Sequence, residues 1–282
     1  MNDLIINFCP TGIIPTKEMS PFVPLSVNEI IDDVHEAYDL GITMAHLHAR
    51  DIDLNNTSSP ETFSKIISGV RKYCGDLIVC FSTSGRVENS LVSRSRHLEL
   101  LGELRPDMAS LTLGSLNFNK EASINHPDMI KNLALKMSEL KIKPELEVFD
   151  TGMINYAKYL IKNEVIKPPF YFNLILGNLF SAQTDPHSIG ILLSHLPEKS
   201  IWAIGGVGNY QLEANSIAIA SGGGVRVGLE DNIWFDKNRT RLCTNGDLIK
   251  RIHIISSIHE RKIMKPSKAR IILGLETKSD LP

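Results

Sequence analysis

Short apolar runs recur along the whole chain and alternate with segments of helical periodicity. Apolar residues return at i, i+3, i+4 and i+7 in the intervening segments, which is the pattern of an amphipathic helix. The clearest such segment is preceded by Ser26, with Glu29 three residues later as a capping box requires, and it stops at Gly41. The apolar runs are residues 4–8, 42–47, 77–81, 108–113, 144–149, 170–176, 201–204 and 224–229. The helical segments are residues 27–40, 128–140, 153–163, 187–196, 210–220 and 246–259.

This alternation predicts an α/β fold. Continuous apolar strands separated by helices indicate a parallel sheet whose faces are both covered. Eight such units favour a (β/α)8 barrel, also called a TIM barrel. An open doubly wound sheet is the alternative, but its usual GxGxxG turn is replaced by CPTG at residues 9–12. No linker or low-complexity tract divides the chain, so we expect one domain over residues 1–282 with a tail at about 265–282.

Composition narrows the function classes. Lys and Arg number 30 against 32 Asp and Glu, and this balance argues against a broad electrostatic nucleic-acid binder. No run of eighteen apolar residues is present, so no membrane span is expected, and the first residues lack the features of a signal peptide. The four cysteines show no CxxC spacing, which favours a reduced, cytoplasmic setting.

Chemistry-bearing side chains collect where the second and eighth runs end. His46 and His48 stand two residues apart, so they project from one face of a strand. Such a pair either grips a metal ion or forms a hydrogen-bonded core pair. Arg226 and Glu230 alternate toward the barrel axis, and the second and eighth strands both flank the first. Glu230 is therefore a candidate third ligand for zinc, with iron or manganese as alternatives, unless it only pairs with Arg226.

Other strand ends are also polar. Ser82, Thr83, Ser84 and Gly85 follow the third run, and their backbone N–H groups can hold an anion. The fourth and fifth runs carry further polar side chains on one face: Ser110, Thr112, Glu145 and Glu147. A buried strand face tolerates so many polar groups only when they are paired. An active site at the carboxyl ends of the strands is the expectation.

Five motifs lie at these strand ends: HLHARD at 46–51, STSG at 82–85, PDMASLTLGSLNF at 106–118, KPELEVFDTGM at 143–153 and GGGVRVGLEDN at 222–232. In order and spacing they resemble the β-keto acid cleavage enzymes. CPTG at 9–12, ILGN at 175–178 and AIGGVGNYQ at 203–211 also fit, so nearly the whole chain is covered.

The resemblance implies a zinc-dependent acyltransferase. A β-keto acid and acetyl-CoA would give acetoacetate and a new acyl-CoA through an enolate and a retro-Claisen step. The implied zinc ligands are His46, His48 and Glu230. Asp231 with Arg226 would form the base dyad, supported by Glu147. The implied substrate-binding residues are Ile14, Ser82, Gly85, Ser110 and Thr112. A homotetramer is also implied.

Three positions depart from the family pattern. Ile14 stands where the type enzyme has an acidic residue for the amino group of its substrate. We therefore expect 5-amino-3-oxohexanoate to be a poor substrate. Ser84 replaces a glycine, and Arg86 follows. Arg86 would meet a second acid group or CoA phosphates, or remain a solvated loop residue.

Two rival functions remain open. Metal-dependent hydrolases of the amidohydrolase type are barrels with an HxH motif, but they carry it on the first strand, whereas here it follows the second run. A non-catalytic barrel that binds ligands would keep the fold without needing the whole set of polar residues. The other histidines fall in predicted helices or loops, and we expect most of them at the surface or at helix caps.

Overall fold

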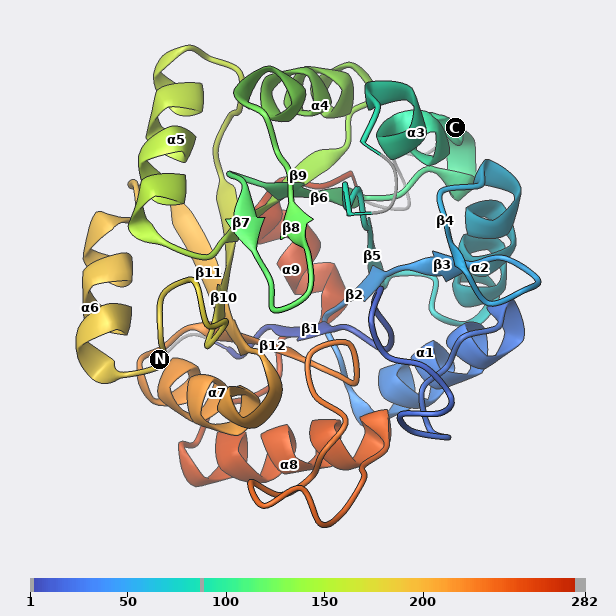
Figure 1. Cartoon of the computed structure of the whole chain (residues 1–282), viewed down its shortest axis with the longest axis vertical. Helices are drawn as coiled ribbons and strands as arrows, with labels where there is room; N and C mark the ends of the chain where they lie inside the picture. The colour runs from blue at the N-terminus through green and yellow to red at the C-terminus, as the bar shows by residue number, and fades with distance from the viewer. Residues whose placement is uncertain (1–2, 87–88, 277–282) are drawn as a thin grey trace.

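Eight parallel strands close into a barrel in the computed structural model, which describes residues 3–86 and 89–276 (Figure 1). Their order around the barrel is β1-β12-β11-β10-β9-β6-β5-β2, so the first strand lies between the second and the last. The predicted barrel is confirmed, and the open sheet is excluded. The strands are β1 (Ile6–Phe8), β2 (Met44–Leu47), β5 (Ile78–Phe81), β6 (Met108–Thr112), β9 (Lys143–Val148), β10 (Phe170–Leu176), β11 (Ser200–Gly206) and β12 (Gly224–Val227).

Helices surround the barrel and bury their apolar stripes against it (Figure 1). The first begins as predicted, because Ser26 and Glu29 form a capping box, and Gly41 ends it with φ 96°. Two of the outer helices, α2 (Pro60–Tyr73) and the five-residue α3 (Leu91–Ser95), were not among the predicted segments. The outer helices are α1 (Val27–Leu40), α2 (Pro60–Tyr73), α3 (Leu91–Ser95), α4 (Pro127–Glu139), α5 (Thr151–Lys162), α6 (Pro186–His195), α7 (Gln211–Ala220) and α8 (Asn245–Ile258).

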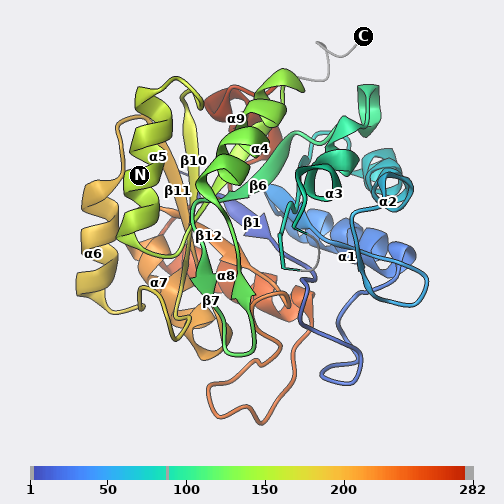
Figure 2. The same ribbon diagram turned by 45° about the horizontal axis from the view of Figure 1, so that its top comes forward.

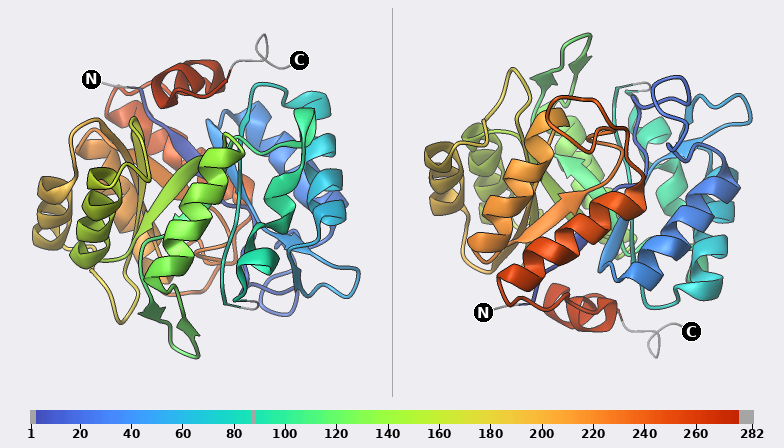
Figure 3. Two further views of the ribbon diagram at one scale, coloured as in Figure 1. Left: turned by 90° about the horizontal axis from the view of Figure 1, so that it is seen from above. Right: turned by 90° about the horizontal axis from the view of Figure 1, so that it is seen from below.

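A further helix, α9 (Pro266–Leu273), lies across the amino-terminal end of the barrel, within the segment expected as a tail (Figure 3). Its Ala269 and Leu273 belong to an apolar cluster with side chains from the amino-terminal part of the barrel. The residues that the barrel contributes to this cluster are Ile5, Met44, Ile78, Cys80, Met108, Tyr171 and Ala203. One end of the barrel is therefore sealed by apolar packing.

The opposite end carries loops and two small hairpins. These are β3 (Ala49–Arg50) with β4 (Asn56–Thr57), and β7 (Leu116–Asn117) with β8 (Ala122–Ser123). Figures 2 and 3 show the β7–β8 hairpin and the long loop between β12 and α8 projecting away from α9. None of the described helices is long and apolar enough to cross a lipid bilayer.

The last strand stops two residues before the predicted boundary. β12 ends at Val227 because Gly228 has φ 153°, and a Cβ atom there would lie 2.0 Å from the carbonyl oxygen of Cys9. Only glycine accepts that close approach. The chain turns at this point, so Leu229, Glu230 and Asp231 follow the strand rather than belong to it.

Candidate active site

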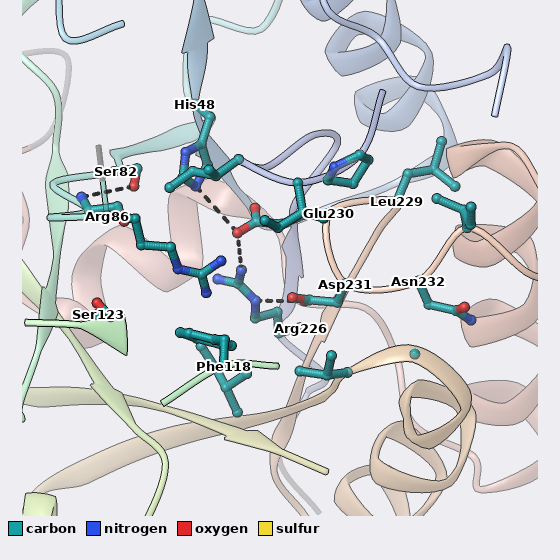
Figure 4. Close-up of a pocket in the computed structure, with 18 of the residues that line it drawn as sticks. His48, Ser82, Arg86, Phe118, Ser123, Arg226, Leu229, Glu230, Asp231 and Asn232 are labelled. Atoms are coloured by element: carbon teal, nitrogen blue, oxygen red, sulfur yellow. Dashed lines mark hydrogen bonds and ion pairs between the residues drawn. The ribbon is translucent and has the colours of Figure 1, made fainter. Parts of the chain in front are cut away.

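A cavity of about 300 Å³ opens among the loops at the carboxyl ends of the strands. Figure 4 shows His48 and Glu230 facing one another in it, with Arg226 and Asp231 beside them. The described residues that line it include Ile14, His48, Ser82, Ser84, Arg86, Thr112, Phe118, Glu147, Arg226, Glu230, Asp231 and Arg239. Residues from all eight barrel strands or the loops that follow them thus meet in one space.

His46, His48 and Glu230 form a group whose ligand atoms all lie within 4.8 Å of one another. The Nε2 atoms of the two histidines are 3.3 Å apart, and Nε2 of His48 lies 3.3 Å from Oε1 of Glu230. The other carboxylate oxygen of Glu230 is buried and has no hydrogen-bond partner. An unsatisfied buried oxygen beside two imidazole nitrogens fits a divalent cation, which would supply the missing interaction.

Glu145 fixes the orientation of His46 from below the cavity. Nδ1 of His46 donates to Oε2 of Glu145 over 2.6 Å, which leaves Nε2 free to act as a ligand. The other oxygen of Glu145 accepts from the side-chain amides of Asn7 and Asn173, and all three residues are fully buried. Sequence reasoning assigned Glu145 no role. The available signal was its alternation with Glu147 along one strand.

Arg226 joins the carboxylates of the site. Its Nε donates to Oδ2 of Asp231 over 2.8 Å, and its Nη2 donates to Oε1 of Glu230 over 2.6 Å. Its Nη1 lies 3.8 Å from Oε1 of Glu147, whose second oxygen accepts from the Thr112 hydroxyl over 2.6 Å. The Arg226 side chain is 2% exposed, so these ion pairs are shielded from solvent. Asp231 is therefore held in one orientation next to Glu230.

Burial and charge set the protonation of these groups. Burial raises the pKa of Asp231, against the opposing effect of Arg226, and burial also raises the pKa of Glu147. Burial lowers the pKa of His48, which keeps its imidazole neutral. For His46, burial acts to lower the pKa, but the carboxylates of Glu145 and Glu230 outweigh it and raise the pKa to about 9. Glu145 and Glu230 therefore favour positive charge at His46, which a bound metal cation would supply in place of a proton on Nε2.

The loop after β1 contacts Glu230 directly. Gly12 approaches so closely that a Cβ atom there would lie 2.4 Å from Cγ of Glu230. The buried Arg50 holds this loop by donating to the backbone oxygens of Gly12, Ile13 and Pro15. Gly12 of the CPTG motif and Arg50 of the HLHARD motif, which are far apart in the chain, thus both help to position the Glu230 carboxylate.

Not every residue predicted to bind substrate reaches the cavity. Ser82, Thr112 and Ile14 line it, whereas Ser110 and Gly85 are absent from its lining. The Ser110 hydroxyl accepts from the backbone N–H of Thr83 over 3.1 Å, and Gly85 packs against the buried Arg94. Both support the turn that carries Ser82. One of the histidines outside the motif, His97, is buried and contacts the Ser82 carbonyl oxygen over 2.9 Å, so it is not a surface residue.

The fold and the site define a class: a (β/α)8 barrel with a candidate metal centre of two histidines and one carboxylate beside an Arg–Asp pair. The family comparison then identifies the group. The model of the beta-keto acid cleavage enzymes matches residues 3–275, and the chain belongs to that family.

Curated relatives agree with this assignment, and a solved structure shares the fold. The chain is 38% identical to a 3-keto-5-aminohexanoate cleavage enzyme of Fusobacterium nucleatum subsp. nucleatum, over 98% of this chain and 99% of that protein. It is 33% identical to a 3-oxoadipate:acetyl-CoA acetyltransferase of Cupriavidus necator, over 96% of this chain and 94% of that protein. The apo structure of ObcA shares the fold with a TM-score of 0.76 at 19% identity, covering 92% of this chain and 66% of that one.

Proposed function

We propose that this protein transfers the acyl group of a β-keto acid to CoA, with acetyl-CoA as co-substrate and acetoacetate as the second product. The observation that carries the proposal is the His46–His48–Glu230 group adjoining the Arg226–Asp231 pair in one cavity. Curated relatives named as acetyl-CoA-dependent transferases of keto acids support it.

The proposed metal site consists of His46, His48 and Glu230, with zinc as the first choice. A divalent cation bound there supplies Lewis acidity toward the keto oxygen of the substrate. The ligand set of two imidazoles and a carboxylate suits zinc, and iron or manganese are alternatives to be tested. Glu145 orients His46 for this role, as carboxylates commonly do behind metal-bound histidines.

Asp231 is the proposed general base. It takes a proton from C2 of the β-keto acid, and the resulting carbanion forms a bond to the carbonyl carbon of acetyl-CoA. The released CoA thiolate adds to the C3 ketone, the C2–C3 bond breaks, and C2 recovers a proton from Asp231. Atoms and charge balance without a redox cofactor. Arg226 orients Asp231, Glu147 holds Arg226, and the Ser82 turn, with Gly85, Ser110 and Thr112, shapes the pocket for the substrate carboxylate and keto group.

The substrate of the Fusobacterium relative is not expected to be the preferred one here. Ile14 lines the cavity and offers no charge to an ammonium group. The three carboxylates that line the described cavity, Glu147, Glu230 and Asp231, all lie within ion-pair distance of Arg226. An ammonium group beside Ile14 would lack a charged partner, which makes 5-amino-3-oxohexanoate a poor substrate.

A cytoplasmic location and a homotetramer complete the proposal. The four cysteines are buried and unpaired, which suits a reducing compartment. The tetramer rests on the family resemblance, and sedimentation of the purified protein tests it.

The deciding experiment measures acetoacetate formed from acetyl-CoA and a panel of β-keto acids, with Asp231→Asn and His46→Ala beside the wild type. We expect Asp231→Asn to abolish turnover while metal content stays at about one ion per chain. His46→Ala should lose the metal and the activity together. Wild-type protein that forms no acetoacetate from any member of the panel, or an active Asp231→Asn variant, would overturn the proposal.

A further inference from the structure

Arg86 extends from the loop after β5 into the cavity. Its guanidinium carbon lies 3.5 Å from the centroid of the Phe118 ring, which is a cation–π contact (Figure 4). Phe118 is itself fixed by edge-on packing against Phe149, with ring centroids 6.0 Å apart. The side chain is therefore supported inside the pocket rather than extended into solvent.

No hydrogen bond or ion pair joins the Arg86 guanidinium to any other residue within 3–86 and 89–276. The other two arginines in the cavity lining differ from it. Arg226 pairs with carboxylates, and Arg239 donates through Nε to the Asn209 side chain over 3.0 Å. A guanidinium is always charged, and a partly buried one without a partner is costly unless an anion from outside fills the gap.

The charges of the cavity point to the same kind of ligand. Three arginines balance three carboxylates among its described lining residues, so a bound divalent cation leaves an excess of two positive charges. A singly charged acid neutralises half of this excess, whereas a doubly charged acid neutralises it fully. Ile14, on the lining, contributes no charge of its own.

We propose that Arg86 binds a second carboxylate at the far end of the substrate chain, which makes the substrate class the 3-oxo dicarboxylic acids. This inference rests on the proposed function and deepens it. One carboxylate and the ketone would occupy the catalytic side of the cavity, and the other carboxylate would meet Arg86 on its Phe118 platform. The products would be acetoacetate and an acyl-CoA with a terminal carboxylate, from the same bond changes given above.

The test uses a matched pair of acids and the purified, metal-loaded full chain. 3-Oxoadipate and 3-oxohexanoate have the same chain length and differ only in whether a carboxylate or a methyl group ends the chain. Dissociation constants are measured without acetyl-CoA, and kcat and KM with it. The variants are Arg86→Gln, Arg86→Lys to restore the charge, and Lys158→Gln, which removes an exposed positive charge on the outer helix α5 as a control.

We expect the wild type to bind 3-oxoadipate about 10- to 100-fold more tightly than 3-oxohexanoate, the range for one charge-assisted hydrogen bond. Arg86→Gln should erase that preference through KM, leave 3-oxohexanoate unchanged, and be partly rescued by Arg86→Lys. An equal loss for both acids, a change confined to the KM of acetyl-CoA, or no change would overturn the inference. Tight, Arg86-dependent binding of 3-oxoadipate without any acetoacetate would instead refute the proposed reaction.

Discussion

Replacing Glu145 by glutamine tests whether this buried carboxylate orients the candidate metal ligand His46. The carboxylate receives His46 Nδ1 on one oxygen and the side-chain amides of Asn7 and Asn173 on the other. Glutamine has the same shape but only one acceptor oxygen. If that oxygen faces His46, the new NH2 group opposes two amide donors. If the amide is reversed, its NH2 group faces Nδ1 and forces the imidazole proton onto Nε2, where the ligand lone pair is needed.

Either orientation carries a cost that can be estimated. Loss of a carboxylate behind a metal-bound histidine typically weakens metal binding about 10- to 100-fold, or about 1.4–2.7 kcal/mol. Two buried donors without acceptors cost about 1–3 kcal/mol each in the free energy of unfolding. We therefore expect Glu145→Gln to lose metal to a competing chelator far sooner than the wild type and to unfold at a lower urea concentration.

Glu147→Gln is the matched control, because it removes the same charge two residues along the same strand. Glu147 has no hydrogen bond to His46, and it contacts Arg226 and Thr112 instead. This variant should keep its metal while turnover falls. Competition titrations with a chromogenic chelator at fixed pH give the affinities. If Glu145→Gln held its metal as tightly as the wild type, the reasoning that Glu145 orients His46 would be wrong.

Three further outcomes are expected. Gly12→Ala should displace Glu230, because the added Cβ would lie 2.4 Å from its Cγ, and should weaken metal binding in the same titration. The control is Gly190→Ala in α6, where the added Cβ meets open space. It should instead raise the free energy of unfolding by about 0.5–1 kcal/mol. Arg50→Met should raise KM and lower metal affinity together, since it releases the loop that carries Gly12; normal metal binding would show that the loop holds itself. Burial raises the pKa of Asp33 from 3.8 to about 7, so the folded chain holds this proton more tightly than the unfolded chain. The stability contributed by the neutral acid is therefore lost as the pH rises from about 4 to 7. Urea titrations should show a smaller decline in Asp33→Asn, and an identical pH profile would contradict the assignment.

The barrel could be predicted because its strands are buried on both faces and its helices on one. These burial patterns appear directly as continuous apolar runs and as helical periodicity. Helix α2 carries the same signal at Phe63, Ile66, Ile67 and Val70 and was nevertheless missed. Helix α9 is harder to predict, because its apolar residues acquire a role only when the barrel end they cover has formed.

The candidate site could likewise be predicted only in part. His46, His48 and Glu230 come together because barrel closure places β2 and β12 on either side of β1, which strand count and alternation imply. The partners of Ser110 and Gly85 do not follow from spacing. Gly85 faces Arg94, and its direction depends on how α3 packs. The contact between Glu145 and His46 spans 99 residues across the barrel, and no local pattern encodes it.

The strand order also has a consequence for folding kinetics. β1 is flanked by β12, and the backbone of Leu4 exchanges hydrogen bonds with Lys262 and Met264. Strand β12, Lys262 and Met264 are all synthesised late, more than 200 residues after β1, and α9 emerges later still. During translation, β1 therefore has an unpaired edge, and the apolar side chains that α9 later covers at the amino-terminal end of the barrel stay exposed to water. Closure is a late, non-local event, so we expect folding to be slow and partly completed chains to be prone to aggregation.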